Sequence, residues 1–535
     1  MIRAILLFAL VASTIALVWY LLGQPVALPV SPLAEGQRLN CVSYTPFHGP
    51  QAPFMKPLRI PDQQIADDLR RLSDVTSCIR TYSAAGTQGK ITRLAANLGF
   101  QVLQGIWIGR NLAENRREIE AALLLARRHP GVIQAFIVGN EVLLRGELGP
   151  ARIKTYLQEV RRRSGLPVTY ADVWEFWLRA PELAASVDFV TIHILPYWED
   201  DPVGAQDAVE HVRAIRSTLA ESFAGKEIWV GEVGWPSAGR MRAGALPSPA
   251  NQAMVLSGVV EAAKAGGWKV NLIEAFDQPW KRLLEGTVGG YWGLYHDAAR
   301  EPKFRWGGPV SNHPEWRLEA GLGIGAALLV FVAAWLSGPS RKLQPIGWGR
   351  SLAIAAIAAS SGLVFGWAAL GLPMEPPELG DRIRSAGMLA LALFVPAFAA
   401  AALARGSSIE SFAVVLNPRR WRRYDGLSLL LAFLFVATVV AAIHVALGLV
   451  FDPRYKDFPL ALLSGPAVAL AIVALSSSPV RRGSGVAEMV AAALLTGSAL
   501  FVIVNEGIAN WQALWFAGLL LALSLTALRA APAPS

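Results

Sequence analysis

Phe136-Ile137-Val138-Gly139-Asn140-Glu141 is the segment from which the fold can be worked out. Its apolar residues have the length and composition of a buried strand, and this strand ends at a glutamate. A second segment, Ile228-Trp229-Val230-Gly231-Glu232, has the same character and also ends at a glutamate. Two buried strands that each finish on a carboxylate predict a sheet whose strand ends carry a polar site.

Strand-like and helix-like segments alternate on both sides of these two. Strict alternation of eight strands with helices predicts a parallel sheet closed into a (β/α)8 TIM barrel, which is an α/β fold. The expected strands are 39–45, 77–83, 101–108, 133–140, 167–172, 187–194, 226–231 and 271–277. The expected helices are 62–74, 91–98, 112–128, 150–164, 178–185, 202–221 and 249–266.

The carboxyl ends of the strands are where TIM barrels carry their active sites. Glu141 ends the fourth expected strand and Glu232 the seventh, so both are expected across one barrel mouth. A lone glutamate is usually a solvated surface group, but a pair placed this way favours glycoside hydrolysis. One carboxyl would protonate the leaving oxygen and the other would attack the anomeric carbon, which in the retaining reaction requires a separation of about 5–5.5 Å.

The composition changes sharply near residue 318, so three domains are expected: 1–30, 31–317 and 318–535. Residues 31–317 mix charged and aromatic residues, whereas 318–535 contain apolar runs long enough to span a bilayer as a polytopic all-α region. Ala4–Leu22 is interpreted as an uncleaved transmembrane anchor, because no clear small-x-small cleavage site follows it. The seven further expected spans are 319–337, 351–371, 386–404, 427–450, 459–476, 486–504 and 511–528.

The distribution of basic residues predicts the orientation of these spans, since cytoplasmic loops retain Lys and Arg. With the N-terminus inside, the inside segments hold 12 basic residues and the short outside loops hold 4. Both termini are therefore expected in the cytoplasm, with residues 31–317 outside. The inside segments also account for the net charge of +9, so nucleic-acid binding is not needed to explain it.

Cys41 and Cys78 lie on the first two expected strands. In an oxidising compartment they could form a disulfide. Two buried strand cysteines are more commonly small apolar residues, and this is the favoured interpretation.

Several motifs follow one another over roughly 37–308. They are Val42-Ser43-Tyr44-Thr45-Pro46-Phe47, Ile79-Arg80-Thr81-Tyr82, Val138-Gly139-Asn140-Glu141, Gly231-Glu232-Val233-Gly234-Trp235-Pro236-Ser237, Glu274-Ala275-Phe276-Asp277-Gln278-Pro279-Trp280-Lys281 and Tyr291-Trp292-Gly293-Leu294. Together they resemble glycoside hydrolase family 17, the β-1,3-glucanases and β-1,3-glucan transferases. The resemblance implies a barrel with the acid/base on strand four and the nucleophile on strand seven.

The resemblance implies Glu141 as acid/base and Glu232 as nucleophile. It implies that Asn140 binds the sugar 2-hydroxyl, that Tyr197 orients Glu232, and that Lys281 lies near the cleft. Gln278 departs from the glutamate of many members, so donor-site preferences are not carried over. Other side chains expected to bind substrate, several of them aromatic faces suited to stacking on sugars, are Tyr44, Arg80, Tyr82, Trp198, Trp235 and Glu274. We expect no cofactor and no metal, because the histidines show no ligand-spaced pair.

The combination of barrel and membrane spans resembles bacterial membrane proteins described as β-(1→6)-glucan synthases. This favours transfer of a β-1,3-glucan over its hydrolysis, which remains the alternative. The expected partners are β-glucan oligo- or polysaccharide, membrane lipid and a glucan synthase. The expected location is the bacterial inner membrane, with the catalytic domain in the periplasm.

Two other classes of function are less favoured by the sequence. A non-catalytic glucan-binding or export protein is disfavoured by the carboxylate pair. Asn417-Pro418-Arg419-Arg420-Trp421 faintly resembles the QxxRW signature of nucleotide-sugar glycosyltransferases, but the inside loops are too short for a nucleotide-binding domain.

Overall fold

The computed structural model describes residues 2–55, 57–338, 347–375, 378–476 and 485–530, with the side chain of Arg420 also excluded. The expected inside residues Arg341, Lys342, Arg481 and Arg482 lie outside this part of the chain. The chain divides into two compact units. One comprises Val26–Arg282 and Val288–Val310, and the other comprises Met1–Pro25, Leu283–Thr287 and Ser311–Ser535.

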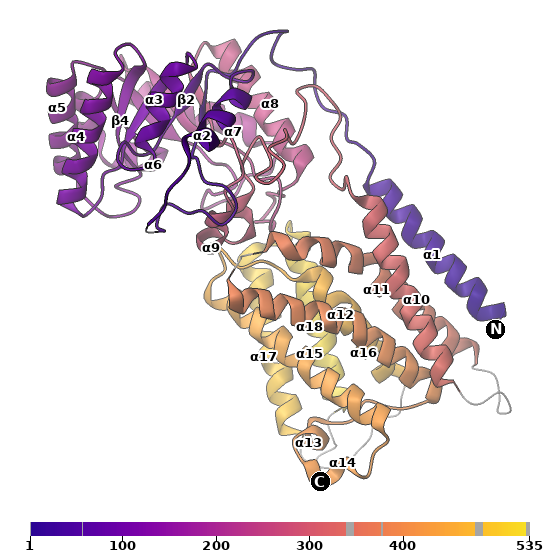
Figure 1. Cartoon of the computed structure of the whole chain (residues 1–535). Helices are drawn as coiled ribbons and strands as arrows, with labels where there is room; N and C mark the ends of the chain where they lie inside the picture. Colours follow the sequence, from indigo (N-terminus) through magenta and orange to yellow (C-terminus); the bar gives the residue numbers. More distant parts are fainter. Residues whose placement is uncertain (1, 56, 339–346, 376–377, 477–484, 531–535) are drawn as a thin grey trace. The chain divides into compact units, whose positions relative to one another are not determined.

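The first unit is a closed barrel of eight parallel strands in sequence order, which confirms the predicted fold (Figure 1). Each strand pairs with the next, and the first closes on the last. The strands are β1 Cys41–Ser43, β2 Cys78–Arg80, β3 Gln101–Ile106, β4 Ile133–Asn140, β5 Val168–Val173, β6 Val190–His193, β7 Ile228–Val233 and β8 Val270–Leu272.

The barrel helices follow the predicted alternation, with one break. The expected helix 178–185 is instead a short helix followed by a 3-10 turn, because Pro181 has no N–H to continue the helical hydrogen bonds. The elements are α2 Asp62–Leu72, α3 Gly89–Asn97, α4 Leu112–Arg128, α5 Pro150–Ser164, α6 Trp174–Arg179, η1 Pro181–Ser186, α7 Ala208–Ser222, α8 Pro249–Gly266, η2 Pro279–Lys281, α9 Arg282–Glu285 and η3 Thr287–Gly290.

A disulfide between Cys41 and Cys78 joins β1 to β2, so the expectation of two unpaired cysteines was wrong. The pairing register sets Val42 beside Ile79, which places Cys41 directly opposite Cys78. Their Cα atoms are 4.5 Å apart, within the range that a disulfide bridges. Both cysteines are buried, and they pack with Leu103, Ala135, Ile137, Ala171 and Phe189. The register, which decides the pairing, is not visible in the sequence.

The second unit is helical. Its long helices are α1 Ile2–Leu22, α10 Trp316–Ser337, α11 Trp348–Gly371, α12 Leu379–Arg405, α15 Gly426–Phe451, α16 Leu460–Ser476, α17 Val486–Glu506 and α18 Trp511–Ala530, and its short elements are η4 Leu372–Met374, α13 Phe412–Val415 and α14 Pro418–Trp421. Each of the eight long helices coincides with an expected span. In the described residues seven helices are long and apolar enough to cross a membrane, while α16, with 17 residues, is shorter.

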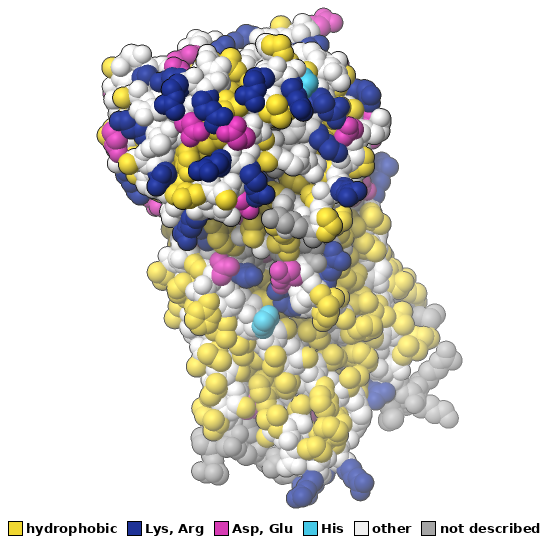
Figure 2. Space-filling model, turned by 60° about the vertical axis from the view of Figure 1, so that its left-hand side comes forward, with side chains coloured by type: hydrophobic (Ala, Val, Ile, Leu, Met, Phe, Trp, Pro, Cys, Tyr) yellow, Lys and Arg dark blue, Asp and Glu magenta, His cyan; other side chains and the backbone are white. Residues whose placement is uncertain are grey.

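Hydrophobic side chains cover much of the visible surface of this unit (Figure 2). Phe451 and Val504, for example, are 83% and 84% exposed. An apolar surface of this kind is stable in lipid rather than in water. The structure therefore suggests a membrane protein.

The two ends of the barrel unit meet each other. Val26 and Val310 form an antiparallel bridge, with N···O distances of 2.8 and 3.0 Å. Within the helical unit, α1 packs on α10, where the rings of Phe8 and Phe331 lie edge to face at 5.7 Å. The helix before the barrel and the helix after it are thus direct neighbours (Figure 1).

We expect the double variant Cys41→Ala/Cys78→Ala to lose stability in the barrel. The disulfide closes a loop with a sequence separation of 37 residues, and loop-closure entropy for that length gives about 4 kcal/mol as the upper size of the effect. Denaturant unfolding of the full-length protein in detergent, followed by near-ultraviolet circular dichroism, measures it. A reductant should lower the stability of the wild type and leave the double variant unchanged. Equal stability of the oxidised wild type and the variant would contradict the prediction.

Candidate active site

Two glutamates stand at the carboxyl ends of their strands. Glu232 lies within β7, one residue before its end, and Glu141 directly follows β4. The backbone turns sharply before Glu141, because Gly139 and Glu141 both have positive φ angles, of 92° and 53°. A Cβ atom on Gly139 would come within 2.9 Å of Val142, so glycine is required there. This turn aims Glu141 over the barrel mouth.

Arg80, the last residue of β2, connects the groups of the site. Its guanidinium is buried, with 1% of the side chain exposed. Nη1 donates to Glu232 Oε1 and to the carbonyl oxygen of Gly231. Nη2 donates to Asn140 Oδ1 and lies 3.4 Å from His193 Nε2. A buried charge needs such partners, because it has lost its hydration.

The carboxylate of Glu232 is buried and held in its ionised form. Burial alone would raise its pKa, but the charge of His193 when its ring is protonated, together with the charges of Arg80 and Lys281, outweighs burial and lowers the pKa to about 2. The hydroxyl of Tyr82 also donates to Glu232 Oε1 at 3.0 Å. Glu232 is therefore an anion at neutral pH.

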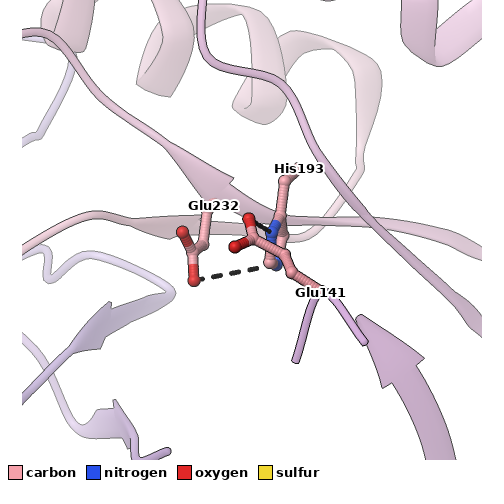
Figure 3. A group of neighbouring side chains, drawn as sticks. All are labelled: Glu141, His193 and Glu232. Atoms are coloured by element: carbon pink, nitrogen blue, oxygen red, sulfur yellow. Dashed lines mark hydrogen bonds and ion pairs between the residues drawn. The ribbon is translucent and has the colours of Figure 1, made fainter. Parts of the chain in front are cut away.

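His193 lies beside both glutamates, and dashed lines join its ring to each of them (Figure 3). It ends β6 and is fully buried, with Nδ1 2.8 Å from Glu141 Oε1 and Nε2 3.7 Å from Glu232 Oε1. Side-chain atoms of the three residues all lie within 4.8 Å of one another. The sequence places a histidine at this strand end, but its contacts depend on the register of β6 against β7, which pairs His193 with Glu232.

Two carboxylates and an imidazole this close together have the composition of a metal site. The charges around them argue against one. Arg80 already donates to Glu232 Oε1, and Lys281 adds a second positive charge whose field reaches Glu232. A cation would have to displace or face these groups.

The structure brings most of the predicted residues to this site. Arg80, Tyr82 and Asn140 contact one another or the glutamates. Glu274 is buried, and its Oε1 lies 2.8 Å from Lys281 Nζ. Burial raises the pKa of Glu274, and the ion pair with Lys281 opposes this.

Three of the predicted substrate-binding residues donate hydrogen bonds to groups other than the two glutamates. The hydroxyl of the buried Tyr44 donates to Asp68 at 2.9 Å, and Nε1 of the buried Trp235 donates to the carbonyl oxygen of Leu246 at 3.1 Å.

The hydroxyl of Tyr197, expected to orient Glu232, donates instead to the carbonyl oxygen of Arg240 at 2.9 Å. Tyr82 supplies the hydroxyl that bonds Glu232. Trp198 lies edge-on to Tyr197, with ring centroids 5.0 Å apart.

The barrel is similar to several known proteins. Residues 41–293 match the family described as the BtgE/BtgC glycoside hydrolase domain. A glucan 1,3-beta-glucosidase of Saccharomyces cerevisiae is 25% identical over 252 residues, which cover 43% of this chain and 80% of that protein. The glucan 1,3-beta-glucosidase BGL2 of Candida albicans is 26% identical over 250 residues, covering 43% and 81%.

Among solved structures, the glycoside hydrolase family 17 beta-1,3-glucanosyltransferase from Rhizomucor miehei shares 22% identity. The alignment covers 50% of this chain and 96% of that chain, with a TM-score of 0.44. Three observations lead to one assignment: the barrel order, the glutamates that directly follow β4 and lie near the end of β7, and the match over 41–293. This stretch of the chain is a glycoside hydrolase domain of family 17.

Proposed function

We propose that this protein cleaves β-1,3-glucan with retention of configuration and transfers the glucan to another sugar hydroxyl. The observation that carries the proposal is the spacing of the carboxyls: an oxygen of Glu141 lies within 4.8 Å of one of Glu232. Retaining enzymes place the two carboxyls about 5–5.5 Å apart, whereas inverting enzymes separate them by about 6.5–9.5 Å to admit a water molecule. The spacing here supports direct attack by Glu232.

The chemistry then divides between the two glutamates. Glu232 attacks the anomeric carbon while Glu141 gives its proton to the leaving glycosidic oxygen, which produces a glycosyl ester on Glu232. In the second half, Glu141 takes the proton of the acceptor hydroxyl as that oxygen displaces Glu232. The second half thus restores to Glu141 the proton that it gave up in the first half.

Asn140 is oriented to help both halves. Its Oδ1 accepts a hydrogen bond from Arg80, which fixes the direction of the amide. The amide nitrogen makes no hydrogen bond within the described part of the chain, so it is available as a donor to the sugar. The hydroxyl beside the attacked carbon is the acceptor that we assign to it.

The substrate class and the choice between transfer and hydrolysis rest on other observations. The relatives in yeasts are glucan 1,3-beta-glucosidases, and the fungal structure is a beta-1,3-glucanosyltransferase. The names of the yeast relatives support hydrolysis as a second candidate function, in which water takes the place of the acceptor sugar. A barrel held at a membrane is better suited to remodelling an emerging polysaccharide, and this supports transfer, including branching to a β-(1→3),(1→6)-glucan.

The location is proposed from the helices and their charges. The described basic residues expected inside are Arg3, Arg350, Arg405, Arg419, Arg422, Arg423 and Arg529. This bias supports cytoplasmic termini and a periplasmic barrel in a bacterial inner membrane. Membrane lipid and a glucan synthase are the partners proposed for the helical unit.

The first test is product analysis with the full-length protein in detergent. End-labelled β-1,3-gluco-oligosaccharides should give products longer than the substrate by mass spectrometry. Glu141→Ala should lower the rate by about 10²–10⁴-fold, the range for loss of a general acid and base, and Glu232→Ala should lower it further. Glu159→Ala is the matched control, because this half-buried residue on α5 pairs with Arg163 and makes no contact with the residues of the site among the described residues.

The outcomes separate the candidates. Only shorter products would establish hydrolysis in place of transfer. Full activity in both active-site variants would remove the catalytic proposal and leave a glucan-binding protein.

We expect activity to persist in acid. Because the pKa of Glu232 is about 2, its ionised form remains above about pH 4, and the acid limb of kcat/KM should lie below that pH. In Arg80→Gln, burial acts on Glu232 with less opposition, so its pKa rises and the acid limb moves to higher pH. The pH profile of kcat/KM measures this, and an unmoved limb in a folded Arg80→Gln protein would contradict it.

The topology predicts the behaviour of reporter fusions. Alkaline phosphatase joined after residue 310 should be active, and the same enzyme joined after residue 535 should be inactive. Green fluorescent protein at the two positions should give the opposite pattern. An active phosphatase at the C-terminus would overturn the proposed orientation.

A further inference from the structure

We propose that His193 determines which oxygen of Glu141 carries the catalytic proton, and that Arg80 enables this by fixing the tautomer of His193. The inference rests on the proposed function, and it gives His193 a positioning role in which the ring neither gains nor loses a proton. It follows from the hydrogen-bonding capacity of three side chains.

The first step concerns Nε2 of His193. A guanidinium can only donate hydrogen bonds, and Arg80 Nη2 points an N–H at Nε2 across 3.4 Å. Nε2 must therefore present its lone pair. Glu232 Oε1 lies 3.7 Å from Nε2, beyond hydrogen-bond distance, and already accepts from Arg80 and Tyr82.

The second step concerns Nδ1. A neutral imidazole with a bare Nε2 carries its proton on Nδ1. Nδ1 lies 2.8 Å from Glu141 Oε1, so it donates to that oxygen. The ring is fully buried at the end of β6, where it has no solvent through which to exchange partners. Oε1 is thus occupied as an acceptor, and the acidic proton of Glu141 resides on Oε2.

The same hydrogen bond serves both halves of the reaction. When Glu141 acts as acid, the proton leaves Oε2 for the glycosidic oxygen, and Oε1 still accepts from His193. When it acts as base, the acceptor hydroxyl returns a proton to Oε2. His193 neither gains nor loses a proton. The opposite tautomer would instead draw the carboxyl proton to Oε1, between Glu141 and the ring, where no substrate could receive it.

Two variants of nearly equal shape separate this role from packing. In His193→Asn the side-chain amide stands where Nδ1 stood and can donate to Glu141. In His193→Leu a side chain of similar size has no donor. Both should be prepared as the full-length protein in detergent, with thermal unfolding checked to be equal between them.

The readout is the dependence on the leaving group. For an unactivated β-1,3-gluco-oligosaccharide, which needs a proton from Glu141, His193→Leu should lower kcat/KM by about 100-fold or more. A dinitrophenyl β-glucoside has a leaving group, dinitrophenolate, that departs without a proton. With this substrate the rate of glycosyl-enzyme formation should fall far less. His193→Asn should recover most of the loss on the oligosaccharide. Equal losses on both substrates, or no recovery by His193→Asn, would overturn the proposal.

A measurement on the wild type tests the tautomer directly. Nitrogen-15 NMR of histidine-labelled protein, with His193 assigned by its absence in His193→Asn, should show a protonated Nδ1 and a bare Nε2. A protonated Nε2 would overturn the inference. The proposed function fails separately: it is lost if Glu141→Ala and Glu232→Ala stay active, whereas wild-type kinetics in His193→Leu would remove only the role of His193.

Discussion

A permanently charged guanidinium enclosed in the barrel is the constraint on which the rest of the site depends. Arg80 cannot lose its proton at any ordinary pH, and removing its charge from water costs several kcal/mol unless good partners replace the water. The partners come from three other strands: Glu232 and the Gly231 carbonyl on β7, Asn140 on β4 and His193 on β6. Satisfying one buried cation therefore orients the groups of the site together.

The buried position of Arg80 also explains which parts of the site the sequence predicts and which it does not. The sequence predicts that Glu141, Glu232 and Asn140 lie near strand ends, because the alternation of strands and helices predicts a barrel. In a barrel the carboxyl ends of all strands meet at the same edge. The contacts of His193 and Tyr82 are not predicted, since they follow from register and from the reach of Arg80 across the interior. For Tyr197 the resemblance implies a contact that orients Glu232, whereas its hydroxyl donates to the carbonyl oxygen of Arg240.

The fold outside the site shows the same division. Helix bounds such as α5 Pro150–Ser164 and α8 Pro249–Gly266 follow from local signals, with Pro at the first turn and a left-handed Gly at the end. The Cys41–Cys78 disulfide depends on which residues face each other across β1 and β2, and no local pattern contains that information. The helices of the second unit were predictable because hydrophobic length alone marks them.

The bridge between Val26 and Val310 means that the polypeptide enters and leaves the barrel at one point. A domain whose two ends adjoin can be inserted between two helices without separating those helices. Here α1 and α10 remain packed on each other. The barrel is thus inserted in the connection between two helices that are already neighbours. Removing residues 26–310 would leave two adjoining helix ends that a short turn could join.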